Sequence, residues 1–75
     1  MVAQLKSFLD AKERLLRRRE VEARTGMACT TIYVRMKAGL FPRPVDIGGG
    51  RVAWRETEVD AWIQARIDAA EAATA

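Results

Sequence analysis

The chain has 75 residues, a net charge of +3, one cysteine and no histidine. So short a chain forms one small domain with a modest core, which leaves little material for the deep pocket of an enzyme. Without histidine or a second cysteine, neither an internal disulfide nor a His/Cys metal site can form, so we expect no catalytic activity, no metal and no cofactor.

The basic residues gather in the first part of the chain. Residues 1–43 hold ten Lys/Arg and four Asp/Glu, a net charge of +6, whereas residues 44–75 hold three and six, a net charge of −3. Such asymmetry predicts either a surface that faces a polyanion or a solvated basic surface. No apolar run reaches membrane-spanning length and no signal segment opens the chain, so we expect a cytoplasmic protein and no membrane partner.

The first 14 residues form an N-terminal extension. Leu5, Phe8 and Leu9 follow helical spacing, which indicates either a short amphipathic helix or a disordered tail. One folded domain is expected over residues 15–70, and residues 71–75 are expected to fray.

Two short helices follow. The run RREVEARTG has acidic residues where a helix begins and Gly26 where it ends. A second helix begins between Ala28 and Thr30 and ends near Ala38, with Ile32 and Met36 on one buried face. The prolines of FPRPV then require extended backbone.

A β-hairpin and a third helix complete the chain. Apolar residues alternate on both sides of three glycines at 48–50, which form the hairpin tip. The last helix begins at Glu56 or Thr57 and continues to about Ala70, with a continuous apolar face. Trp54 and Trp62 are predicted to pack in the core rather than stack on bases. The candidate core residues are Leu15, Leu16, Val21, Met27, Ile32, Met36, Leu40, Phe41, Val45, Ile47, Val52, Trp54, Val59, Trp62, Ile63 and Ile67.

Helix, turn, helix, hairpin and helix is the layout of a winged helix-turn-helix domain, mostly α with a small β-hairpin. The runs RREVEARTGM, TTIYVRMKAGLFPRPV and IGGGRVAWRETEVDAWI resemble the AlpA and phage excisionase family, within the MerR-like winged-helix class, over residues 15–67. The resemblance implies a sequence-specific DNA-binding excisionase, or recombination directionality factor, which bends double-stranded DNA and promotes prophage excision by an integrase. An AlpA-type transcriptional regulator of prophage genes is the alternative.

The chain departs from this family at four positions. Relatives often carry Pro where Arg19 stands, Ser at Ala28, and Arg at Cys29 and Val34. The change at Ala28 removes a capping hydroxyl, which Thr30 could replace if the helix began later. Cys29 and Val34, which stand where relatives carry Arg, remove two cations from the expected DNA face and imply a different target sequence.

Base reading is assigned to the second helix, which enters the major groove in a helix-turn-helix. Thr30 and Thr31 can bind bases or phosphates, or merely cap the helix. Val34 can contact a thymine methyl. Arg35 and Lys37 are expected to bind phosphate or, for Arg35, guanine. Tyr33 is expected to pack at the edge of the core.

Phosphate binding is assigned to the remaining basic residues. Arg17, Arg18 and Arg19, expected ahead of the first helix, are candidates to hold the DNA backbone, as are Arg24 and Arg43. Arg51, beside the glycine tip, is expected to enter the minor groove. Each has the alternative of being an ordinary solvated cation, and Arg55 could either bind phosphate or pair with the acidic start of the last helix.

Three further expectations concern partners. Copies of the protein are expected to associate along DNA through the apolar residues of the N-terminal extension and through the Ala-rich last helix. The resemblance also implies a phage integrase as a partner, and the protein would act at the nucleoid of a bacterial host. A protein-binding inhibitor module that uses the acidic last helix is the less favoured alternative.

Overall fold

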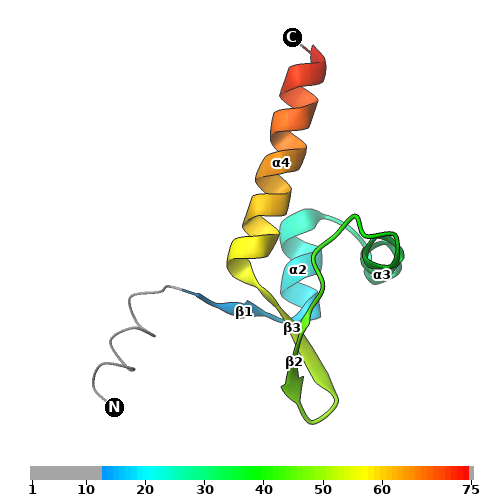
Figure 1. Cartoon of the computed structure of the whole chain (residues 1–75), viewed down its shortest axis with the longest axis vertical. Helices are drawn as coiled ribbons and strands as arrows, with labels where there is room; N and C mark the ends of the chain where they lie inside the picture. The colour runs from blue at the N-terminus through cyan, green and yellow to red at the C-terminus, as the bar shows by residue number, and fades with distance from the viewer. Residues whose placement is uncertain (1–12, 75) are drawn as a thin grey trace, which may run out of the picture.

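The computed structural model describes residues 13–74 and shows three helices and one small sheet (Figure 1). In chain order the elements are β1 (Leu15–Leu16), α2 (Arg18–Thr25), α3 (Cys29–Lys37), β2 (Val45–Gly48), β3 (Arg51–Arg55) and α4 (Glu56–Thr74). The strands form an antiparallel sheet in the order β1-β3-β2. The fold is therefore the predicted winged helix-turn-helix, with the β2–β3 hairpin as its wing. The amphipathic segment predicted around Leu5, Phe8 and Leu9 lies outside the described residues.

Helix α2 is defined by hydrogen bonds at both ends. At its start the Glu20 carboxylate accepts a hydrogen bond from the backbone N–H of Arg17, at 3.2 Å. At its end Gly26 adopts a φ of 73° and its N–H donates to the carbonyl of Glu22, at 2.8 Å. A positive φ is strained for any residue with a Cβ, so glycine ends the helix here and directs the chain into α3.

The arginine run lies partly inside this helix rather than ahead of it. Arg17 is the residue that precedes the helix, and Arg18 and Arg19 form its first turn. The prediction that all three precede the helix was therefore wrong by two residues. The error arose because no proline or capping hydroxyl marks the start.

Helix α3 begins at Cys29, with Ala28 in the capping position and no side-chain cap. Thr30 therefore lies within the first turn, and the expectation that it could cap a later helix start was wrong. The helix ends at Lys37, close to the predicted end. The threonine hydroxyls at its start are thus free of a capping role.

Strand β1 was not predicted. Leu15 and Leu16 pair with Arg55 and Trp54 of β3, so the two leucines belong to the sheet. In the wing, Val45 pairs with Ala53, and a register shift follows between Asp46 and Gly48. Two residues are too few for an alternation pattern, and their partners lie about 40 residues further along the chain, so no local signal marks this strand.

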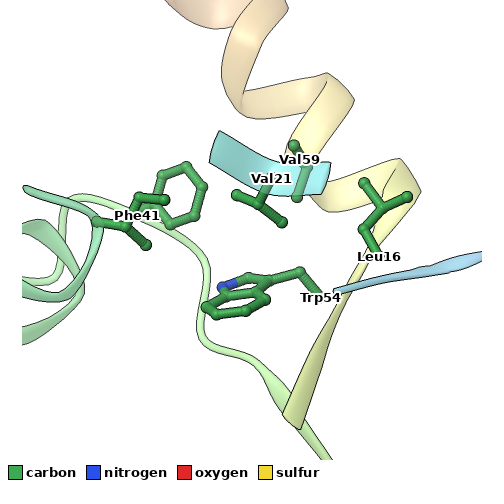
Figure 2. Packing of buried hydrophobic residues seen from close by; sticks show 6 residues of the cluster. Leu16, Val21, Phe41, Trp54 and Val59 are labelled. Carbon is green, nitrogen blue, oxygen red and sulfur yellow. The ribbon is translucent and has the colours of Figure 1, made fainter. Parts of the chain in front are cut away.

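The core is built around Trp54, whose side chain is fully buried (Figure 2). Its indole N–H donates to the backbone carbonyl of Pro42 at 3.0 Å, which satisfies its polar atom and fixes the loop that leads to the wing. The buried apolar residues come from β1, β3, the three helices and the loop after α3: Leu16, Val21, Ile32, Phe41, Ala53, Trp54 and Val59. Met27, Met36, Val52, Trp62 and Ile63 pack against them.

Five predicted core residues are instead exposed: Leu15, Leu40, Val45, Ile47 and Ile67. Trp62 is half-buried, and its N–H donates to the carbonyl of Leu40 at 2.8 Å. Apolar spacing counts every large hydrophobic as core, but a domain this small cannot enclose them all. Ala53 was missed because alanine carries little hydrophobic signal.

Helix α4 leaves the domain and extends away from the wing (Figure 1). Val59 is buried, but every residue from Gln64 to Thr74 is exposed. The helix continues past its predicted end at Ala70, because alanine is the strongest helix former even without tertiary contacts. Within residues 13–74, none of the helices has the length and apolar character that crossing a bilayer requires.

Candidate nucleic-acid interface

One side of α3 faces solvent along its whole length. Thr30, Val34 and Lys37, at i, i+4 and i+7, form a single exposed stripe, and Val34 is 67% exposed. Ile32 on the opposite side is fully buried in the core. A large apolar side chain held this far into solvent contributes nothing to the core, so the stripe is available for an external ligand.

Beside α3 lies a hollow, here called the arginine hollow, of about 430 Å³. It is lined by the start of α2, by α3 and by the wing: Arg17, Arg18, Arg19, Tyr33, Gly50, Arg51 and Val52. The start of a helix carries a partial positive charge from its unpaired N–H groups, which adds to the charge of the four arginines. Segments more than 30 residues apart therefore converge on a concave surface suited to an anion.

Carboxylates neutralise some of the basic residues near this hollow. Arg18 pairs with Glu22 at 3.2 Å, and Arg14 pairs with Glu20 at 2.5 Å. Among residues 13–74, Arg17, Arg19 and Arg51 form no ion pair. The uncompensated charge of the hollow is therefore carried by these three.

Tyr33 joins the arginine hollow to a second basic hollow. Its ring packs edge-on against Trp54, with centroids 6.4 Å apart, as predicted for a residue at the core's edge. It also lines a further depression together with Met36, Lys37 and Arg43. The cationic surface thus continues from the wing tip, past Tyr33, to the end of α3.

Arg35 lines neither of these two basic hollows. Its guanidinium sits over the Trp62 ring, 5.9 Å from the ring centroid, and the residue is half-buried. Along α3 it lies on the side away from Val34 and towards α4, next to Thr31. The contact is a cation–π interaction that helps hold α3 against α4.

Arg24 is also engaged within the protein. Its guanidinium bonds the Glu56 carboxylate at 2.6 Å and the Asp60 carboxylate at 3.2 Å, which fastens α2 to the start of α4. This answers the question left open for Arg55: it is Arg24, not Arg55, that pairs with the acidic start of the last helix. Arg55 itself is exposed on β3.

Asp46 supports the wing and was missed by the sequence analysis. Its carboxylate accepts a hydrogen bond from the N–H of Gly48 at 2.8 Å, at the point where the register shifts. The signal was present, since an aspartate two residues before a glycine commonly forms such a turn. Asp46 therefore shapes the hairpin that presents Arg51.

A helix pair whose second member exposes a polar and apolar stripe, flanked by a glycine-tipped wing and a basic hollow, defines a winged helix-turn-helix protein. The model of the family described as prophage CP4-57 regulatory protein (AlpA) matches residues 14–67, so the chain belongs to the AlpA family. This confirms the resemblance found in the sequence, and membership in a family of regulators agrees with the expectation that the chain is not an enzyme.

A relative in Enterobacteria phage P4 is an uncharacterized protein named ORF88. The two are 45% identical over 56 residues, which is 75% of this chain and 64% of the phage protein. The matched part therefore spans just under two thirds of that relative's length.

Proposed function

We propose that the protein binds double-stranded DNA, with α3 in the major groove and the wing against the adjacent minor groove. The observation that carries this proposal is the arginine hollow beside the exposed stripe of α3. There Arg17, Arg19 and Arg51, which form no ion pair within residues 13–74, meet from the start of α2 and from the wing. Such a surface matches a DNA strand, because most protein–DNA hydrogen bonds go to the sugar-phosphate backbone. Lys37 and Arg43 extend the same surface to the far side of Tyr33.

Base reading is proposed for the exposed stripe of α3. Thr30 can bond a base edge or a phosphate, and Val34 can pack against a thymine methyl. Thr31 borders the stripe and is proposed as a flanking contact. Arg24 and Arg35 were also candidates from the sequence, but two carboxylates and an indole ring already occupy their guanidinium groups. We therefore assign them no DNA contact.

The proposed biological role is that of an excisionase, which bends the DNA beside an attachment site and so promotes integrase-mediated prophage excision. Regulation of prophage transcription is the second candidate, and the description of the AlpA family as regulatory favours it. Either role uses the same DNA contacts and would be exercised at the nucleoid of the bacterial host. Self-association along DNA is proposed through the exposed half of α4, which carries the 43%-exposed Ile67.

Two measurements test the proposal. DNase footprinting across an attachment region and across prophage promoters would show which DNA is bound. If the protein protected neither region from cleavage, both roles would be contradicted. Integrase-dependent excision in vitro, with and without the protein, separates the two. Stimulated excision is expected for an excisionase, whereas a bound promoter without any stimulation would identify a transcriptional regulator.

The same excision assay offers a matched pair of variants. Arg51→Ala removes the wing cation of the hollow and should reduce excision. Arg55→Ala removes an exposed cation of β3 that does not line the hollow, and should leave excision unchanged. Equal effects of both would mean that general positive charge, rather than this surface, matters.

A further inference from the structure

The packing of the core does not use the hydroxyl of Tyr33. The residue is 41% exposed, and its ring packs edge-on against the fully buried Trp54, with the ring centroids 6.4 Å apart. Within residues 13–74 the Tyr33 hydroxyl makes no hydrogen bond to another protein group. A phenylalanine would make the same ring contact, so the hydroxyl, which can both donate and accept, is free to bind a ligand.

Tyr33 lies between two groups of cations. It lines the arginine hollow, with its three unpaired arginines, and it also lines the second hollow, which contains Lys37 and Arg43. Among residues 13–74, Lys37 and Arg43 form no ion pair either. A DNA strand carries a phosphate at every nucleotide. A strand that followed this surface from one hollow to the other would therefore pass over Tyr33.

The place of Tyr33 on α3 favours the DNA backbone over the bases. Tyr33 comes three residues after Thr30 and four before Lys37, so it borders the exposed stripe of α3 on the side of the two hollows. With α3 in the major groove, the stripe faces the base edges. A residue beside the stripe then faces the strand that forms one wall of the groove.

We propose that the Tyr33 hydroxyl donates a hydrogen bond to a phosphate oxygen of the DNA strand that runs along the two hollows. The inference rests on the proposed function and adds an uncharged contact to the cationic ones. The packing against Trp54 restricts the Tyr33 ring, so little side-chain freedom is lost on binding. Because the hydroxyl carries no charge, its contribution to affinity does not depend on salt, unlike that of the arginines.

The substitution Tyr33→Phe tests the contact, because it removes the hydroxyl and keeps the ring. We expect the affinity for duplex DNA, measured by fluorescence anisotropy, to fall about tenfold through loss of a hydrogen bond to a charged group. The loss should be equal at about 50 and 200 mM KCl and on duplexes of different sequence. The matched variant Lys37→Met removes a charge from the same surface and should make the salt slope shallower by about 0.9. The urea midpoint of Tyr33→Phe should equal that of the wild type.

Three results would overturn the proposal. The first is an affinity of Tyr33→Phe within about twofold of wild type, which is too small for a lost bond to phosphate. The second is a loss confined to one preferred sequence, because the hydroxyl would then read a base. The third is a loss accompanied by a lower urea midpoint, because the hydroxyl would then act on the fold.

A second measurement locates the contact on the DNA. In a duplex that carries the footprinted site, single phosphates are replaced by uncharged methylphosphonates, and each replacement is combined with Tyr33→Phe in a double-mutant cycle. We expect coupling at a phosphate that lies, on one strand, between those coupled to Arg51→Ala and to Lys37→Met. Coupling at no phosphate, or only outside this interval, would overturn the proposal.

The two levels of the hypothesis fail in different ways. A wild-type protein that bound no duplex would refute the proposed function together with the Tyr33 contact. Salt-dependent binding by the wild type, with unchanged affinity in Tyr33→Phe, would remove the Tyr33 contact alone.

Discussion

The salt dependence of DNA binding tests how the charges of the arginine hollow are used. Affinity for duplex DNA falls with salt, because each neutralised phosphate releases counterions, and the slope of log K against log salt is about −0.9 for each phosphate contact. Arg17, Arg19 and Arg51 are the three arginines of the hollow that form no ion pair within residues 13–74. Replacing all three by alanine should therefore make the slope shallower by about 2.7.

This change is large enough to measure. Between about 50 and 200 mM KCl, the wild-type protein should lose about 40-fold more affinity than the triple variant. Fluorescence anisotropy on a labelled duplex of arbitrary sequence suffices, since the phosphate contribution does not depend on sequence.

Two controls make the prediction specific. Arg66→Ala removes an exposed cation of α4 outside the hollow and should leave the slope unchanged. Arg18→Ala should have a smaller effect than Arg19→Ala, because Arg18 is already paired with Glu22. If the triple variant kept the wild-type slope, the arginine hollow would not bind the DNA backbone and the proposed mode of binding would be refuted.

Five further substitutions probe the fold and the base-reading stripe. Trp54→Ala should cost about 3–5 kcal/mol and leave little folded protein by circular dichroism, whereas Trp62→Ala should cost less, because Trp62 is only half-buried. Gly26→Ala forces a Cβ into a φ of 73° and should cost about 1–2 kcal/mol in urea unfolding, although the space around it is open. Arg24→Ala should cost about 0.5–1 kcal/mol through loss of its partly exposed ion pairs and leave the salt slope of DNA binding unchanged; a shallower slope would mean that Arg24 contacts phosphate after all. Val34→Ser should change the preferred base in a selection from random duplexes without changing the salt slope, and an unaltered preference would remove Val34 from base reading.

The parts of the fold that the sequence predicts correctly depend on local signals. Gly26 marks the end of α2, the glycines at 48–50 mark the tip of the wing, and acidic residues mark the start of α4. Each signal acts within a few residues of itself. Strand β1 has no such signal, because Leu15 and Leu16 become a strand only by pairing with β3.

The same distinction applies to the candidate interface. The sequence of α3 alone is sufficient to identify Thr30, Val34 and Lys37 as candidate DNA contacts, because helical spacing within one segment places them on one side of the helix. The roles of Arg24 and Arg35 depend instead on partners in α4. Glu56, the partner of Arg24, lies 32 residues further along the chain. A basic residue in a sequence therefore identifies a charge but not its partner, and only the fold separates the arginines that stabilise the domain from those left for a ligand.

The long exposed end of α4 has a practical consequence for handling the protein. Every residue from Gln64 to Thr74 is exposed, and this end of α4 points away from the wing (Figure 1). A fluorophore or an affinity tag attached near Thr74 would therefore stand clear of the hairpin and of the hydrophobic interior. Labelled protein could then be used in the binding measurements described above without altering any group proposed to touch a nucleotide.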